Sequence, residues 1–312
     1  MSINREALKD RFEGCLLGLA IGDALGGKFE AQSADAIRAR FPTSESLIAY
    51  PQDEIWYTDD TQMAIGVAEA LIEQGEIVEE SLCRAFVANY VASRGYGRGA
   101  RAVLDAMEES RDYRAVSEQY FPGGSFGNGA AMRVAPVGLV FGSDRARLWD
   151  QARLSALPTH RHPLGIACST AACQAGICSR GSIRRAAFSL ALLSSCESNE
   201  YRRRLKRRRG SVSMTFARQS DWRRCTQRPL PSRSFVSDFE SFESTICNVI
   251  FRGDTDTLAA MAGRLSGAYL GLRAPAELAG GDLLERSPKG RDYLRALAGR
   301  LLEVHDRLTT AN

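Results

Sequence analysis

The chain has 312 residues, of which 41 are basic and 37 acidic, and its formal net charge is +4. With 44% hydrophobic and 25% charged residues, it has the composition of a folded globular protein, which excludes a disordered or collagen-like chain. No charged-then-apolar leader precedes Asn4, and the first long apolar run, Cys15 to Ile21, is too short to cross a bilayer. We therefore expect a cytoplasmic protein whose eight cysteines stay reduced.

The net charge is the sum of two unlike parts. Residues 180–233 contain 15 basic and three acidic side chains, which leaves 26 basic and 34 acidic residues in the remainder. The body of the chain is thus acidic, and one segment is strongly basic. A segment of about 180–240 also lacks a sustained apolar face, and taken alone it would be a solvated or disordered insertion.

The first predicted element is a helix from Glu6 to Leu25. Gly14, Gly18, Gly22 and Gly26 recur every four residues along one of its faces. Glycine costs a helix about 1 kcal/mol relative to alanine at each position. Four glycines in register therefore predict a face on which another backbone approaches closely.

The rest of the chain is also predicted to be mainly helical. Apolar spacing predicts further helices at Asp60–Gln74, Glu80–Ser93, Ala100–Glu109, Ala130–Val140, Gly165–Ile177, Leu258–Leu270 and Lys289–Leu308. Glycine-rich turns at 94–99, 123–129 and 252–254 interrupt them. Because alternating β-branched runs are almost absent, we expect a single all-α domain over residues 1–312.

Two acidic clusters of similar composition each run into an apolar helix. They are Tyr57 to Thr61 and Gly253 to Thr257. Helix capping is the simplest interpretation of either cluster, because Thr and Asp are favoured at helix N-termini. Capping needs one such side chain, however, and each cluster has at least three. If the two helix starts meet, their hard oxygen donors suit Mg²⁺ or Ca²⁺.

Two glycine-rich loops offer features that suit a phosphate. Gly123 to Gly129 precedes a predicted helix and presents backbone amides at its N-terminus, where anions bind readily. Arg94 to Gly99 is a second such loop, and its Tyr96 could stack on a ring. Each loop alone is typical of a plain turn. Beside the acidic clusters, both favour a ligand that carries phosphates and hydroxyls.

Six motifs in order resemble the ADP-ribosylglycohydrolase family, most closely its ADP-ribosylhydrolase 3 branch. They are Gly18–Gly26 with Phe29 and Glu30, Tyr57–Thr61, Arg94–Gly97, Gly127–Pro136, Thr159–His160 and Gly253–Gly263. The resemblance covers about residues 10–178 and 240–272. It implies an all-α fold with two Mg²⁺ ions in a central cleft that binds ADP-ribose.

The resemblance also implies a role for individual residues. The implied metal ligands are Thr58, Asp59, Asp60, Asp254, Asp256 and Thr257. The implied contacts to the distal ribose, the diphosphate and the cleft wall are Gly95, Tyr96, Gly97, Ser125, Phe126, Gly127, Asn128 and His160. Glu30 matches a glutamate beside the scissile bond, and either Glu30 or Asp256 is expected to take a proton from water.

The implied activity is metal-dependent hydrolysis at the ribosyl C1″ of serine-linked ADP-ribosylated protein or of poly(ADP-ribose). Cleavage of arginine-linked ADP-ribose and a non-catalytic ADP-ribose-binding or structural role are the alternatives. We expect a monomer whose partners are ADP-ribosylated protein or poly(ADP-ribose), without a membrane or direct nucleic-acid contact.

The sequence departs from the family pattern in two places. Arg252 stands where members usually have a glycine. Residues 180–240 do not show the pattern of helices rich in small residues that the family normally has there. Three explanations for that segment stay open. It is a diverged insertion, a basic arm that binds nucleic acid or poly(ADP-ribose) through phosphates, or a frame-shifted stretch.

Overall fold

The computed structural model describes residues 4–50, 53–125, 127–173, 240–251, 255–273, 275, 284–286 and 288–310. Their regular secondary structure is helical, apart from one isolated parallel bridge between Ile55 and Leu284. This confirms the predicted all-α fold. The structure does not describe Phe126, the predicted turn at 252–254 with Asp254, or the segment 180–240 apart from Glu240.

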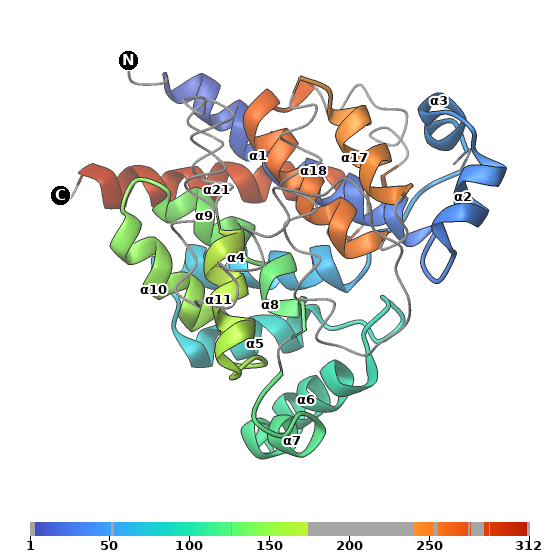
Figure 1. Cartoon of the computed structure of the whole chain (residues 1–312). Coiled ribbons are helices and arrows are strands. Elements are labelled where there is room, and N and C mark those ends of the chain that lie inside the picture. The colour runs from blue at the N-terminus through green and yellow to red at the C-terminus, as the bar shows by residue number, and fades with distance from the viewer. Residues whose placement is uncertain are drawn as a thin grey trace, which may run out of the picture.

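The centre of the fold is a close pair of helices, α1 (Arg5–Gly27) and α18 (Asp256–Leu270) (Figure 1). A Cβ atom added at any of the four regularly spaced glycines of α1 would lie 2.2 to 2.4 Å from a backbone oxygen of this partner segment. The four oxygens belong to Gly267, Gly263, Ala259 and Thr255. The two helices are therefore antiparallel and in backbone contact along the whole stripe, as the glycine spacing predicted.

Further helices pack around this pair and complete the core. Helix α21 (Arg291–Thr310) contacts α1, α4 (Asp59–Gln74) and α9 (Ala135–Phe141), and α4 also contacts α5 (Glu79–Asn89). Helix α4 also contacts α1 and α18, and its first turn is hydrogen-bonded to residues of both. This arrangement brings two of the predicted motifs to one place.

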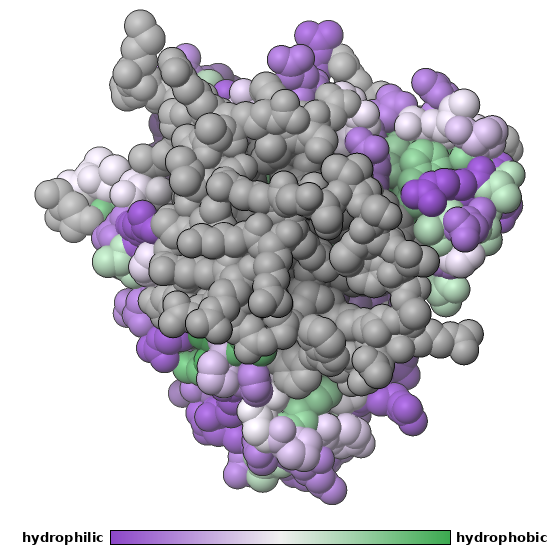
Figure 2. Space-filling model, viewed as in Figure 1, coloured by the Kyte–Doolittle hydropathy of each residue, from purple (hydrophilic) through white to green (hydrophobic). Residues whose placement is uncertain are grey.

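The other described helices extend this core outward. They are α2 (Ala34–Arg40), α3 (Ser44–Ile48), α6 (Arg98–Glu108), α7 (Tyr113–Tyr120), α8 (Gly129–Met132), α10 (Arg145–Ala156), α11 (Pro163–Ala172) and α17 (Phe242–Ile250). Helices α6 and α7 form a projecting pair with a mainly hydrophilic surface on the face shown in Figure 2. Among the described helices, none is both long and apolar enough to cross a membrane.

Several predicted boundaries differ from the structure. The expected helix over 130–140 is divided into α8 and α9, because Pro136 sits in the first turn of α9 and cannot continue a preceding helix. Helix α5 ends at Asn89, four residues before Ser93, where the chain becomes extended at Tyr90. Helices α2, α3, α7, α10 and α17 were not predicted.

Candidate active site

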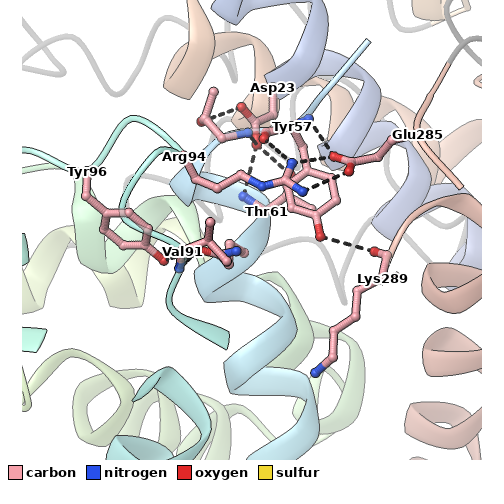
Figure 3. A network of polar contacts seen from close by, with 10 residues as sticks. Asp23, Tyr57, Thr61, Val91, Arg94, Tyr96, Glu285 and Lys289 are labelled. Carbon is pink, nitrogen blue, oxygen red and sulfur yellow. Dashed lines mark hydrogen bonds and ion pairs between the residues drawn. The ribbon is translucent and has the colours of Figure 1, made fainter. Parts of the chain in front are cut away.

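A buried carboxylate on α1 holds the beginning of α4. Asp23 is fully buried and accepts four hydrogen bonds. Thr58 donates from its backbone N–H at 3.0 Å and from its hydroxyl at 2.6 Å. Thr61 donates from the same two groups at 3.0 and 2.6 Å. Figure 3 shows Asp23 directed at this first turn.

This arrangement contradicts one of the two interpretations of the first acidic cluster, helix capping by Thr58. Thr58 is the N-cap residue of α4, but its side chain makes no capping bond to its own helix. Asp23 instead supplies the acceptor from another helix, including the acceptor for the Thr61 N–H in the first turn. The interpretation of Thr58 as a local helix cap is therefore wrong. The carboxylates of Asp59 and Asp60 are not needed as caps.

The second acidic cluster meets the first. The Thr257 hydroxyl donates to Asp60 Oδ2 at 3.3 Å, and the Thr58 hydroxyl, which donates its proton to Asp23, lies 3.4 Å from the same oxygen. Thr255, at the N-cap of α18, also makes no side-chain capping bond. The two helix starts therefore converge on Asp60, as expected if they share a ligand. Asp254 belongs to the part of this motif that the structure does not describe.

Burial and mutual repulsion keep the pKa values of these carboxyl groups high. Burial raises the pKa of Asp59 to about 7, and the charges of Asp23, Asp256 and Glu30 add to the effect. Burial and the charges of Asp23, Asp256 and Asp59 raise the pKa of Asp60 well above its usual range. Burial also raises the pKa of Asp23 to about 6. The ionised form of a carboxyl group in these surroundings is unfavourable, unless a cation offsets its charge.

Two oxygen atoms of the cluster are buried without a partner, namely Asp60 Oδ1 and Thr255 Oγ1. Buried polar atoms normally have hydrogen-bond partners, so an orphaned carboxylate oxygen among other acids suits a bound cation. The available donors are hard oxygens, which Mg²⁺ and Ca²⁺ prefer. The residues therefore fit such an ion. Within the described part of the chain, no group of three or more His, Cys, Asp or Glu side chains is placed so that it could hold a metal ion.

Glu30 lies at the edge of this cluster. It is exposed, and its charge is close enough to affect Asp59. The preceding residue, Phe29, is fully buried and packs edge-on against Phe41, with ring centroids 5.4 Å apart. This contact anchors the turn after α1. Glu30 is thereby held near the acids as an exposed residue.

The turn at 94–97 lies against the acids. Gly95 has a φ of +88°, and a Cβ added there would lie 3.6 Å from Asp59 Oδ1. The Tyr96 ring is 3% exposed, packs edge-on against Tyr90, and its hydroxyl donates to Gln62 at 2.9 Å. The expectation that Tyr96 stacks on a ligand ring is therefore wrong. Its ring belongs to the core, and the turn offers its backbone to the site.

The loop at 123–129 packs against the segment that carries His160. The Gly127 N–H donates to Ser125 Oγ at 3.3 Å, and a Cβ added at Gly127 would lie 3.6 Å from His160 Nε2. The other ring nitrogen of His160 is 2.7 Å from the Thr159 hydroxyl. Asn128 is the N-cap of α8, which has only four residues, so the helix dipole expected there is small.

A further ion pair borders the cluster and was not predicted. Both terminal nitrogens of Arg94 donate hydrogen bonds to the carboxylate of Glu285, and the distance from Nη2 to Oε2 is 2.8 Å. Figure 3 shows the two groups facing each other. Asp23 was also missed as a site residue. It lies inside the Gly18–Gly26 motif, where its acidic side chain on an otherwise apolar, glycine-rich face was the available signal.

Hard oxygen donors at two helix starts, bordered by glycine-rich turns, suit a metal-assisted hydrolase. The ADP-ribosylglycohydrolase family model matches residues 4–310, and the chain therefore belongs to that family. Members of this family act on ADP-ribosyl bonds. Both the predicted family and the predicted enzyme class are confirmed.

Individual relatives agree with this assignment. The chain is 28% identical to ADP-ribosylhydrolase ARH3 of Mus musculus, over 84% of each protein. It is also 28% identical to the ADP-ribosyl-[dinitrogen reductase] glycohydrolase of Rhodospirillum rubrum, over 85% of this chain and 87% of that one. A solved structure described as an ADP-ribosylglycohydrolase-related protein complex superposes with a TM-score of 0.73 at 25% identity, covering 96% of this chain and 99% of that one.

Proposed function

We propose that the protein is a Mg²⁺-dependent hydrolase that cleaves the ribosyl C1″ bond and releases ADP-ribose. Its proposed substrates are serine-linked ADP-ribosylated protein and poly(ADP-ribose). The observation that carries this proposal is the convergence of two helix starts on Asp60, in a chain of this family. The similarity to ADP-ribosylhydrolase ARH3 supports hydrolysis of ADP-ribosyl bonds, and the serine linkage is what the resemblance to the ADP-ribosylhydrolase 3 branch implies.

The proposed site holds two Mg²⁺ ions through six side chains. They are Thr58, Asp59, Asp60, Asp254, Asp256 and Thr257. When bound, such ions supply charge that fixes ribose hydroxyls and makes a water molecule more acidic. Asp23 supports the ligand set, since it fixes the Thr58 hydroxyl at 2.6 Å and orders the first turn of α4.

Cleavage at C1″ passes through a state with oxocarbenium character, so the site must orient the ribose and remove a proton from the attacking water. We assign the proton transfer to Glu30 or Asp256. Glu30 is exposed beside the acids, so its carboxylate is accessible to water. The assigned substrate contacts are the backbone of Gly95, Tyr96 and Gly97, the loop at 125–128, and His160.

Cleavage of arginine-linked ADP-ribose is the second candidate. A relative named as an ADP-ribosyl-[dinitrogen reductase] glycohydrolase is as similar to this chain as ADP-ribosylhydrolase ARH3 is, at 28% sequence identity. The test compares peptides that carry ADP-ribose on serine or on arginine, and poly(ADP-ribose). Released ADP-ribose is measured by mass spectrometry with Mg²⁺ and with EDTA. We expect release from the serine-linked peptide with Mg²⁺ alone. Release only from the arginine-linked peptide would replace the proposed linkage, whereas binding of ADP-ribose without any release would refute hydrolysis.

A further inference from the structure

A buried ion pair lies outside the oxygen cluster and joins the two turns that border it. Glu285 is 1% exposed, and the side chain of its partner Arg94 is 13% exposed. The ion pair is bidentate, because each terminal nitrogen of Arg94 donates to a different oxygen of Glu285. A bidentate ion pair fixes the orientation of the two groups as well as the distance between them.

The same carboxylate also holds the segment that leads into α4. The Tyr57 N–H donates to Glu285 Oε1 at 3.1 Å, and Arg94 Nη1 donates to the Tyr57 carbonyl oxygen at 2.8 Å. The backbone N–H of Glu285 donates to the Ile55 carbonyl oxygen at 3.0 Å. Both sides of Tyr57 are therefore tied to the ion pair, and Thr58 is the next residue.

The turn at 94–97 is held by the same pair from its other side. The guanidinium carbon of Arg94 lies 4.2 Å from the centroid of the Tyr57 ring and 5.6 Å from that of Trp56. Gly95 follows directly and lies against Asp59 and Thr58. A movement of Arg94 would therefore displace both the turn and the first two residues of the acidic cluster.

We propose that Glu285 is a positioning residue for the active site. Through Arg94 and the Tyr57 backbone it sets the Gly95–Gly97 turn against the start of α4. It acts on the site through these two groups, and its printed hydrogen bonds are not with the acids. The inference rests on the proposed function, because its effect is measured on binding and turnover of ADP-ribosyl compounds.

The competing explanation is that the pair only stabilises the fold, and the chain contains a matched control. Glu13 is 5% exposed and pairs with Arg295 at 3.0 Å and with Lys9 at 3.4 Å. This pair joins α1 to α21, away from the two turns. Glu13→Gln therefore removes a buried, arginine-paired carboxylate without disturbing the site.

The test compares the wild-type protein with Glu285→Gln and Glu13→Gln. The dissociation constant for ADP-ribose is measured by calorimetry in excess Mg²⁺, together with KM, kcat and Tm. We expect both variants to lower Tm, because each removes the charge of a buried carboxylate that is paired with a cation. Only Glu285→Gln should raise the dissociation constant and KM, by roughly tenfold, since small displacements of positioning groups have effects of that size. Glu13→Gln should change both constants by less than about twofold.

A second variant covers the case in which Glu285→Gln does not fold. Arg94→Lys keeps the positive charge but loses the bidentate geometry, and it should raise the dissociation constant in the same direction. The fluorescence of Trp56, obtained by difference from a Trp56→Phe protein, should become easier to quench with acrylamide in either variant. Trp56 rests on Arg94 and is 53% exposed, so it reports directly on the turn.

Each outcome has a defined consequence. The inference is overturned if Glu285→Gln, or Arg94→Lys in its place, binds ADP-ribose as Glu13→Gln does while the wild-type protein is active. Failure of the proposed function is a different result. The wild-type protein would then show neither ADP-ribose binding nor turnover, and this would overturn both the proposed function and the positioning role of Glu285.

Discussion

Asp23 shows how a single buried side chain changes the role of its neighbours. Its carboxylate satisfies two backbone N–H groups and two hydroxyls at the start of α4. These are donors that a local cap would otherwise serve. Because the acceptor comes from α1, the acidic residues at the helix start remain available for a ligand. The arrangement of the cluster thus depends on a residue 35 positions earlier in the chain.

Two substitutions at Asp23 separate its hydrogen bonds from its charge. Asp23→Ala leaves four donors without an acceptor and should lower the free energy of unfolding by about 3 kcal/mol or more. Asp23→Asn keeps one carbonyl oxygen and should cost roughly half as much. Urea denaturation of both variants in EDTA measures the difference. Equal losses would contradict the role of Asp23 as an acceptor for several donors.

Glu30 can be tested separately from metal binding, because it is exposed at the edge of the cluster. Glu30→Gln removes the proposed proton acceptor but retains the size and polarity of the side chain. We expect kcat to fall by about 100-fold or more, the size typical of general-base catalysis, while ADP-ribose affinity changes little. Steady-state kinetics and calorimetry measure the two quantities. An unchanged kcat would assign the proton transfer elsewhere, with Asp256 the remaining candidate.

The sequence predicted local features of the site better than its long-range partners. The convergence of the clusters containing Asp60 and Thr257 was expected, because both had the same composition before an apolar helix. Glu285 was missed because its pairing with Arg94 spans 191 positions and has no local signature. The buried position of Tyr96 was missed for the same reason. Its hydrogen bond to Gln62 depends on how the turn packs against α4.

At the scale of whole elements, the contact between α1 and α18 sets the geometry of the site. Each added Cβ on the glycine face of α1 would overlap a backbone oxygen of the partner, so the helices approach as closely as their backbones allow. Asp23 follows Gly22 on α1, and Asp256 and Thr257 begin α18. The glycine stripe was legible in the sequence because it repeats every four residues. The helix break before Pro136 was missed because apolar spacing continues through it.

A pair of glycine substitutions tests this contact. In Gly18→Ala the new methyl group would lie 2.3 Å from the Gly263 carbonyl oxygen, so the helices must separate. We expect a loss of about 3 kcal/mol in unfolding free energy and weaker ADP-ribose binding. Gly299→Ala is the control, since nothing lies within 4 Å of the added atom on α21. It should stabilise the protein by up to about 1 kcal/mol, because alanine favours a helix. Equal effects of the two substitutions would contradict backbone contact.

At the scale of the whole molecule, the acidic cluster should couple stability to pH and metal. The pKa of Asp59 is about 7 in the folded protein, against about 4 in an unfolded chain. Between these values the folded state holds more protons, so stability is lost as pH rises from 4 through 7. In EDTA we therefore expect Tm to fall between pH 5 and pH 8 more steeply than in Asp59→Asn. Mg²⁺ should restore Tm most strongly at pH 8.

Differential scanning calorimetry of the two proteins measures these slopes. The wild-type protein in EDTA is compared with Asp59→Asn at each pH, so that titration of groups away from the acidic cluster cancels. Parallel curves for the two proteins would contradict the raised pKa of Asp59. A Mg²⁺ effect equal at pH 5 and pH 8 would contradict competition between protons and the ion.

The central claim is that the acids gathered from two helix starts form a metal-dependent site for ADP-ribosyl hydrolysis. It is tested most directly by the rate of ADP-ribose release from a serine-linked peptide as Mg²⁺ is titrated into EDTA-treated protein, for the wild type and for Asp256→Ala. We predict a rate that rises from the background and saturates in the wild-type protein, and no rise in Asp256→Ala. A wild-type rate that is independent of Mg²⁺, or an undiminished rate in Asp256→Ala, would contradict the claim.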